Sequence, residues 1–472
     1  MKLHLFHYSV INLHFTSGMA LRVGEFRKDG RSPFFTEGYF GSPKLPWEVR
    51  YDNSYPNVMF DDKDGKWKLY YTLFIVDPDA ERTPLEERPH THYAPSAERI
   101  TGVCYAESHD GVTWERPNLG IVEFRGSREN NILFKHAHGT GVFLDEVETD
   151  PDRRYKLITK LEYSTRNHFM VSAFSPDGIT WSEPIPWRNH NPKADTHNFV
   201  FRDPDTREFV LITRVMRDGI RVVARSTSRD FVTWSEPVEV MRGRGPGAQV
   251  YSMPVMPYDG TFLGFPSIYR EGDRSAPDFD LVDLGLAFSR TTEHWELLSD
   301  SDSPLPRGEG SYPDGAFDSS CVYAAMPLPV GDELVMYYMG GNGPHTDHRE
   351  TSFGRASIHR DKVAYYSPSG AEEGTLVIGP LSIFGSTIEL FADVDEGGCI
   401  EYDVVRDLRG GSALQGFERG NCVPIDRSGV TRLSFANADF EDLGGGHCFI
   451  RAFARDARLY TLAGDVMAKH ML

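Results

Sequence analysis

One seven-residue pattern recurs along the chain and constrains its fold more than any other feature. It reads Ser-His-Asp-Gly-Val-Thr-Trp at 108–114, Ser-Pro-Asp-Gly-Ile-Thr-Trp at 175–181 and Ser-Arg-Asp-Phe-Val-Thr-Trp at 228–234, with a degenerate copy at 289–295. Asp-Gly favours a tight turn because glycine adopts positive φ at little cost. The β-branched residue and Trp that follow favour a strand. Each copy therefore predicts a β-hairpin.

Each hairpin closes a unit of four predicted strands. In the first unit three strands precede the turn, at 56–60, 67–74 and 103–106, and the fourth begins at Trp114. A fifth unit lacks the Trp motif and has strands at 321–326, 333–339, 353–359 and 362–366. Successive four-stranded units are typical of propeller blades. The sequence predicts an all-β chain with a five-bladed β-propeller; the alternative is a pair of β-sandwiches with coincidental hairpins.

A second domain is predicted after the propeller. Residues 367–374, Ser-Pro-Ser-Gly-Ala-Glu-Glu-Gly, are turn formers and predict a linker. Segments of alternating polar and apolar residues follow and predict a β-sandwich. We therefore expect three parts: an N-terminal segment packed on the propeller at 1–49, the catalytic five-bladed β-propeller at 50–366, and the C-terminal β-sandwich at 374–472.

Charge narrows the range of partners. The chain has 69 acidic and 50 basic residues and a formal net charge of −19, so it repels nucleic acid and anionic membrane surfaces. A neutral carbohydrate substrate meets no such barrier. No sequence feature predicts an oligomeric state.

Location and cofactors follow from what the sequence lacks. None of the five cysteines forms a Cys-x-x-Cys pair, which argues against a zinc or redox motif. No apolar run reaches the about 20 residues of a membrane span. Histidines and an asparagine interrupt residues 1–18, which makes them a poor signal peptide. We expect a cytoplasmic protein without cofactors, with Met1 or Met19 as its natural start.

Polar residues gather where the first strand of each predicted unit begins. In a propeller these innermost strands surround a channel whose mouth commonly binds ligands. Asp52, Asp195 and Asp318 occupy this place in the first, third and fifth units. Glycosidic cleavage needs one protonated and one ionised carboxyl group, and crowding raises the pKa of one of them. We predict that these three residues are catalytic; for each, a role as turn or cap residue is the alternative.

Two other acids and a set of polar residues complete the predicted site. Glu107 and Asp283 end or begin third strands and are candidate proton donors, with surface charge as the alternative reading. A Gly-rich loop that carries His345 and Arg349 is expected to arch over the mouth. The predicted substrate-binding residues are Asn53, Asn57, His197, Asn198, Tyr251, His345 and Arg349. No metal site is predicted, because the acidic turn at 393–396 favours a solvated loop over a calcium site.

Several motifs, taken as a set, resemble those of a known group of proteins. They are Tyr-Pro-Asn-Val-Met-Phe-Asp-Asp at 55–62, Tyr-Ala-Glu-Ser-His-Asp-Gly at 105–111, Asp-Thr-His-Asn-Phe at 195–199, Gln-Val-Tyr-Ser-Met at 249–253, Phe-Asp-Ser-Ser at 317–320 and Gly-Gly-Asn-Gly-Pro-His at 340–345. Over nearly the whole chain they resemble bacterial proteins described as glycoside hydrolase family 32-like or family 43-like. The resemblance implies a five-bladed propeller related to furanosidases of fructans and arabinans, which use three acids from separate blades. It implies that Asp52 is the first-blade acid and Asp195 the second.

The sequence departs from this group in the fourth unit, where the expected glutamate near 249–252 is absent. Asp203 lies in an Arg-Asp-Pro sequence similar to a family 32 motif, but it is predicted to be a turn residue. The function we predict is an exo-acting glycoside hydrolase on a furanoside-containing glycan or oligosaccharide. The alternatives are a glycoside phosphorylase or transglycosidase, with Arg214, His345 and Arg349 as a phosphate cradle, and a non-catalytic sugar-binding propeller.

Overall fold

The computed structural model describes residues 1–36, 44–52, 54–164, 166–189, 191–192, 194–370 and 372–469. The chain is nearly all β. It divides into two compact units: residues 25–357 form one, and both chain ends, 1–24 and 358–472, form the other. Among the described residues, no helix has the length and apolar character needed to cross a bilayer. The helical segments are α1 (Pro78–Arg82), η2 (Arg88–His90), η3 (Pro151–Arg153), η4 (Arg360–Lys362), η5 (Arg419–Asn421) and η6 (Phe440–Leu443).

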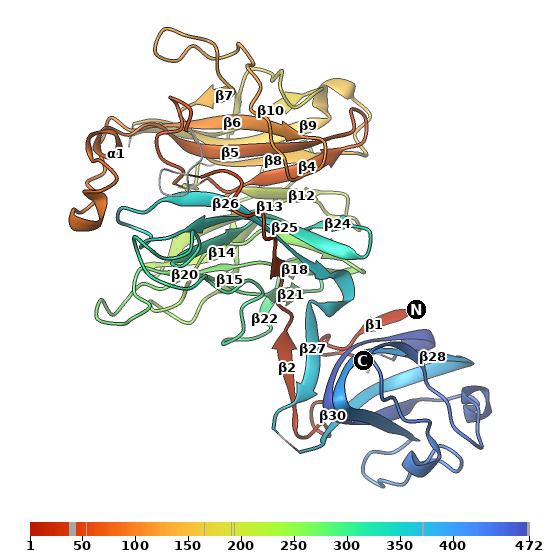
Figure 1. Cartoon of the computed structure of the whole chain (residues 1–472). Helices are drawn as coiled ribbons and strands as arrows, with labels where there is room; N and C mark the ends of the chain where they lie inside the picture. The colour runs from red at the N-terminus through yellow and green to blue at the C-terminus, as the bar shows by residue number, and fades with distance from the viewer. Residues whose placement is uncertain are drawn as a thin grey trace. The chain divides into compact units, whose positions relative to one another are not determined.

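Three four-stranded antiparallel sheets follow one another in the 25–357 unit (Figure 1). Sheet 1 contains β4 (Asn57–Asp61), β5 (Lys66–Val76), β6 (Ile100–Ser108) and β7 (Ile132–Lys135). Sheet 2 contains β8 (Ala137–Leu144), β9 (Tyr155–Ser164), β10 (Asn167–Ser175) and β11 (Ile185–Pro186). Sheet 3 contains β12 (Phe199–Arg202), β13 (Phe209–Arg217), β14 (Ile220–Ser228) and β15 (Val238–Arg242). The sequence predicts the first strands of these units at 56–60, 140–144 and 197–201, and each observed first strand begins within three residues of the predicted start.

The recurring motif forms the same hydrogen-bonded turn at the end of the third strand in these sheets. In sheet 1, Asp110 Oδ1 accepts from the backbone N–H groups of Val112 at 2.8 Å and Thr113 at 2.7 Å. The Ser108 hydroxyl accepts from the N–H of Gly111 at 2.9 Å. The copies at 175–181 and 228–234 repeat these bonds. The motif aspartates therefore stabilise turns.

The fourth unit differs from the prediction because its strands are broken. The strands that the sequence predicts at 249–256, 261–268 and 284–288 are each split in two. Pro254 and Pro266 lie at two of the breaks, where they lack the N–H that a ladder needs. One set of halves forms sheet 4: β17 (Val255–Tyr258), β18 (Thr261–Gly264), β21 (Ala287–Ser289) and β22 (Glu296–Leu297). The other halves, β16 (Gln249–Ser252), β19 (Ser267–Tyr269) and β20 (Val282–Leu284), continue into the last sheet through a parallel pairing of Val282 with Cys321.

That last sheet, sheet 5, has eight strands. After β20 it contains β23 (Cys321–Ala324), β25 (Glu333–Gly341), β26 (Thr351–His359) and β3 (Arg27–Lys28), and β24 (Leu328–Val330) pairs with β25. The strand predicted at 362–366 does not join it. Residues 364–368 instead form β27 (Ala364–Pro368), which pairs with β2 (Met19–Val23) in the other unit, and β3 takes the edge beside β26.

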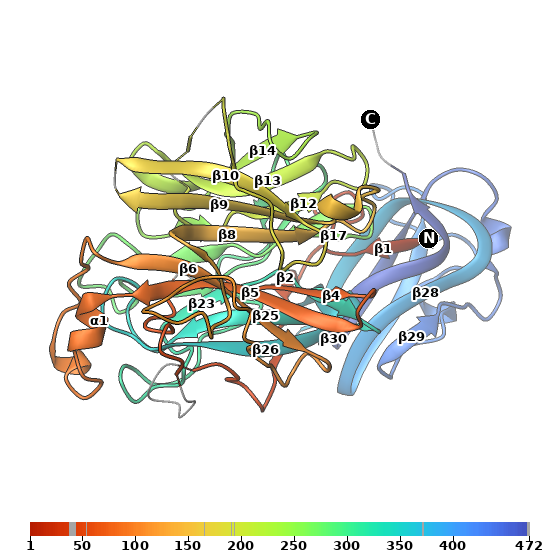
Figure 2. The ribbon, with the colours of Figure 1, turned by 90° about the horizontal axis from the view of Figure 1, so that it is seen from above.

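Buried side chains join each sheet to the next. One core lies between sheets 1 and 2, another between sheets 2 and 3, and a third between sheets 3 and 4. A further core joins sheet 5 back to sheet 1 through residues such as Tyr71, Tyr323 and Tyr337. Figure 2 shows the ribbons of sheets 1 and 2 lying side by side. The first strands of sheets 1, 2 and 3 and the residues that follow β23 also line one cavity of about 260 Å³.

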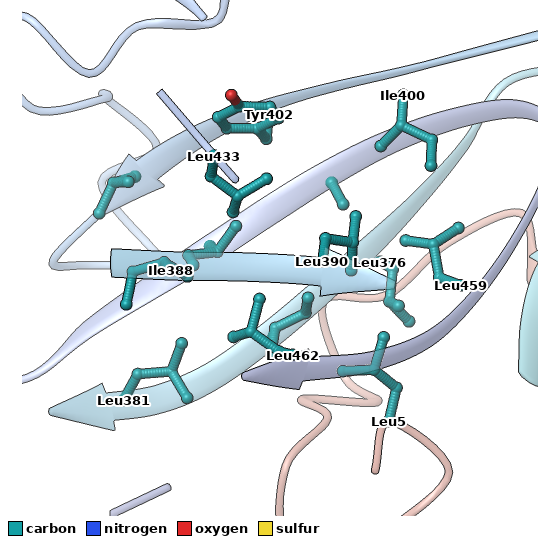
Figure 3. Close-up of a cluster of buried hydrophobic side chains, with 14 of the residues drawn as sticks. Leu5, Leu376, Leu381, Ile388, Leu390, Ile400, Tyr402, Leu433, Leu459 and Leu462 are labelled. Atoms are coloured by element: carbon teal, nitrogen blue, oxygen red, sulfur yellow. The ribbon is translucent and has the colours of Figure 1, made fainter. Parts of the chain in front are cut away.

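The unit formed by the chain ends is a second β structure with its own core (Figure 3). Its long strands β28 (Gly374–Val405) and β30 (Cys448–Ala468) bend and pair with each other twice. β29 (Gly429–Arg432) pairs with β28, and β1 (Lys2–His4) pairs with β30. The core includes Leu5, Leu390, Ile400 and Leu462.

Two expectations about domain organisation differ from this structure. Residues 1–24 do not belong to the 25–357 unit, because β1 and β2 complete the ladders of β30 and β27. The second unit already begins at residue 358, so the segment predicted as a linker lies inside it, between β27 and β28. Residue 371 of that segment lies outside the described residues.

Candidate functional site

A group of charged and aromatic residues lies around Tyr251, the third residue of β16. The His345 ring lies 4.7 Å from the Tyr251 ring, and the Arg214 guanidinium lies 4.5 Å from the same ring. Arg349 pairs with Asp52, and Arg214 pairs with Asp195. We call these six residues, Asp52, Asp195, Arg214, Tyr251, His345 and Arg349, the Tyr251 cluster. It brings together two of the predicted catalytic acids.

Asp52 is anchored by two arginines. Arg349 donates to its carboxylate, and Arg50 lies 3.5 Å from it. Arg349 also donates to the carbonyl oxygens of Pro344 and His345, so the Asp52–Arg349 pair fixes the Gly-rich loop that carries His345. Burial raises the pKa of Asp52, but the charges of Arg349 and Arg50 outweigh it and hold that pKa at about 2. Asp52 is therefore ionised at neutral pH.

Asp195 is the accessible acid of the cluster. Its side chain is 45% exposed, compared with 12% for Asp52. Burial alone would raise the pKa of Asp195. The charges of Arg214, His138 and Lys160 lower this pKa by more than burial raises it, so the pKa of Asp195 lies below its usual value. Asp195 thus presents a carboxylate that solvent or substrate can reach.

Histidine and tyrosine complete the other side of the cluster. The Tyr323 hydroxyl bonds His345 Nδ1 at 2.5 Å, and Tyr269 packs against the same ring at 4.9 Å. Burial and the neighbouring charge of Arg349 lower the pKa of His345, so its ring is neutral at pH 7. A neutral imidazole and tyrosines offer hydrogen bonds and ring faces to a polar ligand.

Several buried nitrogen atoms in and beside the cluster have no hydrogen-bond partner. They are Arg50 Nε, His138 Nε2, Arg214 Nη1, Arg221 Nε and Arg349 Nε. Buried donors are normally satisfied, and exceptions commonly mark sites where water or a ligand supplies the partner. Their concentration around Asp52 and Asp195 favours a ligand with many hydrogen-bond acceptors.

Three predicted substrate-binding residues instead hold the first strands together. The Asn57 side chain donates to Thr140 O at 3.1 Å, and His197 Nε2 lies 3.1 Å from Asn57 Oδ1. The Asn198 side chain donates to Gly139 O at 2.6 Å. All three residues are buried, and burial lowers the pKa of His197 to about 3. Asn53, which was also predicted to bind substrate, lies outside the described residues.

Asp318 does not join the Tyr251 cluster. Its side chain is 2% exposed and bonds Lys28 Nζ at 2.7 Å and the Tyr338 hydroxyl at 3.0 Å. On β25, the flanking Tyr337 and Met339 pack toward sheet 1, so Tyr338 faces the other side of sheet 5. Lys28 comes from β3, a strand that the sequence did not predict. We therefore leave Asp318 out of the candidate site.

Asp283 and Glu107 also lie elsewhere. Each carboxylate oxygen of Asp283 accepts from an arginine, Arg270 at 2.9 Å and Arg307 at 2.8 Å, and the residue lines a separate cavity of about 840 Å³. Glu107 bonds Lys66 at 2.7 Å and pairs across the strands with Lys68. Lys68 lies on β5, and farther along β5 Phe74 pairs with Arg50, which lies close to Asp52 in the sequence. Because Lys68 and Phe74 are six residues apart on β5, Glu107 lies about 20 Å from the end of β5 near Asp52.

The structure adds residues that were not predicted as part of the site. Arg214, on β13, was considered only as part of a phosphate cradle. His138, Lys160 and Glu162, on β8 and β9, affect the charge around Asp195. His138 begins a first strand in the same way as the predicted acids, so its position was a usable signal. Lys160 and Glu162 come from β9, the second strand of sheet 2. Which residues they face depends on the register in which β8 and β9 pair.

Comparisons with known proteins find only solved structures of limited similarity. No family model matches the sequence, and neither does any curated protein. An N-acetylgalactosamine deacetylase from F. plautii, solved with blood group B trisaccharide, has a TM-score of 0.49 at 14% identity and covers 72% of this chain and 96% of its own.

Two other similar structures have lower scores. One is described under the GH130 family of mannoside phosphorylases, which contains glycoside hydrolases that target β-1,2 mannosidic linkages in Candida mannan. It has a TM-score of 0.46 at 13% identity and covers 71% of this chain and 94% of its own. A β-1,2-mannobiose phosphorylase from Listeria innocua has a TM-score of 0.46 at 12% identity and covers 72% of this chain and 98% of its own. Because every one of these scores lies below 0.5, the function is argued from the residues of this chain alone.

Proposed function

We propose that this protein is a carbohydrate-active enzyme that cleaves glycosidic bonds at the Tyr251 cluster. The proposal includes its architecture: sheets 1 to 3, the broken fourth unit and sheet 5 are five blades of a propeller. The chain of cores that leads from sheet 1 through sheet 5 and back to sheet 1 supports this arrangement. The finer expectation, an exo-acting hydrolase of furanosides, remains part of the proposal, and the reaction needs no cofactor.

One observation carries the functional proposal. Two carboxylates that precede the first strands of different sheets, Asp52 and Asp195, belong to the Tyr251 cluster, and each is kept ionised by a buried arginine. An ionised carboxylate can act as base or nucleophile at a sugar carbon. Asp195 is the accessible one, so we assign it this role, whereas Asp52 positions the loop of His345 through Arg349. The unpartnered donors nearby suit sugar hydroxyls.

The same donors favour phosphorolysis as a second candidate. Arg214 pairs with Asp195 but leaves its Nη1 atom buried and unpartnered. Arginine binds phosphate well because its planar group offers several donors in a fixed geometry. Water and phosphate as the attacking group are distinguished by running the reaction with and without phosphate and identifying the sugar product.

Substitution of Asp195 tests the assignment. We expect Asp195→Asn to lower turnover by a factor on the order of 10² or more on whichever substrate a panel of aryl furanosides and pyranosides identifies, because Asn keeps the shape but not the charge. Asp203→Asn is the matched control: Asp203 accepts N–H bonds in a turn at the far end of β12, and Asn fulfils that role. Full activity of Asp195→Asn would exclude the proposed role, and sugar binding without turnover in the wild type would favour a binding protein.

A further inference from the structure

His138 lies level with Asp195 on the neighbouring first strand. A Cβ atom on Gly139 would collide with the carbonyl oxygen of Thr196, and one on Gly141 would collide with that of Asn198. The two glycines therefore let the backbones of sheets 2 and 3 touch in a fixed register. The same register places His138 next to Asp195, which agrees with the effect of its charge on that carboxylate.

His138 is held by a glutamate and has one ring nitrogen left over. Its Nδ1 atom lies 3.1 Å from Glu162 Oε2, and Lys160 Nζ lies 3.2 Å from the same oxygen. Its Nε2 atom has no partner. The side chains are 14% exposed for His138 and 30% for Glu162. An imidazole oriented by a carboxylate, with its second nitrogen unpartnered, is the arrangement of a proton-transfer residue.

Neither acid of the Tyr251 cluster supplies the proton that glycosidic cleavage requires. Asp52 and Asp195 are each bound to an arginine and stay ionised at neutral pH. The leaving sugar oxygen nevertheless needs a proton when the bond to the anomeric carbon breaks. The site described so far has a base but lacks an acid.

We propose that His138 is the general acid of the glycosidic cleavage and that Glu162 positions it. This inference rests on the proposed function. The bond between the anomeric carbon and the leaving oxygen breaks, its electron pair stays on that oxygen, and the oxygen takes the proton from Nε2 of the imidazolium. A water oxygen bonds to the carbon and gives its proton to Asp195, and exchange with solvent restores both residues.

The leaving group of the substrate tests this assignment. A dinitrophenyl glycoside leaves without protonation, whereas an alkyl or sugar leaving group needs it. We expect His138→Gln to lower turnover of the unactivated glycoside by a factor on the order of 10² or more and to change dinitrophenyl glycoside turnover by less than about 5-fold. Asp195→Asn should impair both substrates.

Glu162→Gln tests the positioning role through the pH profile. Among the described residues, the charged groups near His138 are Lys160 and Glu162 from β9, Asp195, and Arg214, which pairs with Asp195. Loss of the Glu162 charge makes the imidazolium more acidic, so the alkaline limb of kcat/KM should move to lower pH. Glu148→Gln is the matched control, because Glu148 bonds Lys156 at 3.1 Å on the same sheet, and it should leave the profile unchanged.

Distinct results separate failure of this assignment from failure of the proposed function. If His138→Gln impairs both glycosides equally, or neither, His138 is not the acid although the enzyme still cleaves glycosides. An unshifted alkaline limb in Glu162→Gln would overturn the positioning role. If the wild type cleaves neither substrate, the proposed function itself fails and the inference falls with it.

Discussion

At the scale of single residues, the ion pair between Asp52 and Arg349 belongs to the candidate site and also stabilises the folded protein. The Arg349 side chain is 1% exposed, so its charge depends on Asp52 for compensation. Removal of one partner from a buried pair typically costs about 3–5 kcal/mol. We expect Asp52→Asn to lower the free energy of unfolding by about this amount in urea titrations at pH 7. Asp195→Asn, at an exposed carboxylate, should lower it far less; equal effects would contradict this difference.

The same pair predicts how stability depends on pH. The pKa of Asp52 falls from the usual 3.8 to about 2 in the folded protein, which corresponds to roughly 2 kcal/mol. Because the folded pKa is the lower one, this contribution is fully present above about pH 4 and is lost as the pH falls toward 2. The gap in unfolding free energy between wild type and Asp52→Asn should therefore shrink between pH 5 and pH 2.5. A constant gap would show that Asp52 does not titrate in this way.

At the scale of elements, the glycine of the repeated turn is restricted by its neighbour. Gly178 has a φ of +79°, and a Cβ atom there would collide with the hydroxyl of the buried Tyr70 and lie 3.0 Å from Tyr155. Gly65 has a φ of +67° but open space around it. Ala at either position pays about 1 kcal/mol for its backbone conformation. We expect Gly178→Ala to cost at least about 2 kcal/mol more than Gly65→Ala in urea titrations; equal costs would mean that Tyr70 moves aside freely.

These elements show what the sequence could reveal. The turns at 108–114, 175–181 and 228–234 were predictable because a local pattern specifies their hydrogen bonds. The edge strand β3 was not, because two residues carry no periodic signal and its partner β26 lies at the other end of the 25–357 unit in the sequence. Asp318 was misplaced for the same reason: its partner Lys28 belongs to β3.

Asp52 and Asp195 were identifiable from the position that they share at the start of a first strand. Their partners Arg349 and Arg214 determine the charge of the site, and those partners depend on tertiary contacts that no local pattern encodes.

At the scale of the whole molecule, the N-terminal residues stabilise the unit formed by the chain ends. Leu3, Leu5, Val10 and Ile11 are buried in its core. A fully buried side chain of this kind contributes about 1.5–3 kcal/mol, so a chain that starts at Met19 should lose several kcal/mol in this unit. We expect it to show a lower unfolding temperature by calorimetry and to keep the glycosidase activity assigned to the 25–357 unit.

Two point variants check this explanation without truncation. Leu5 is fully buried, and Leu13 is 59% exposed. Leu5→Ala should destabilise by about 2–5 kcal/mol, and Leu13→Ala should have little effect. An unchanged unfolding temperature in Leu5→Ala would exclude a stabilising role for this segment.

The pairing of β1 with β30 also determines the order in which the protein is assembled on the ribosome. Lys2 pairs with Ala463, so β1 must wait for a partner strand that is synthesised much later. At roughly 5–20 residues per second this wait lasts about 20–90 s, during which Leu3, Leu5, Val10 and Ile11 lack the β30 side of their core. Sheets 1 to 3 pair strands that are close in sequence and can form as they emerge. Residues 3–11 are therefore exposed to chaperones and proteases until β30 has been made.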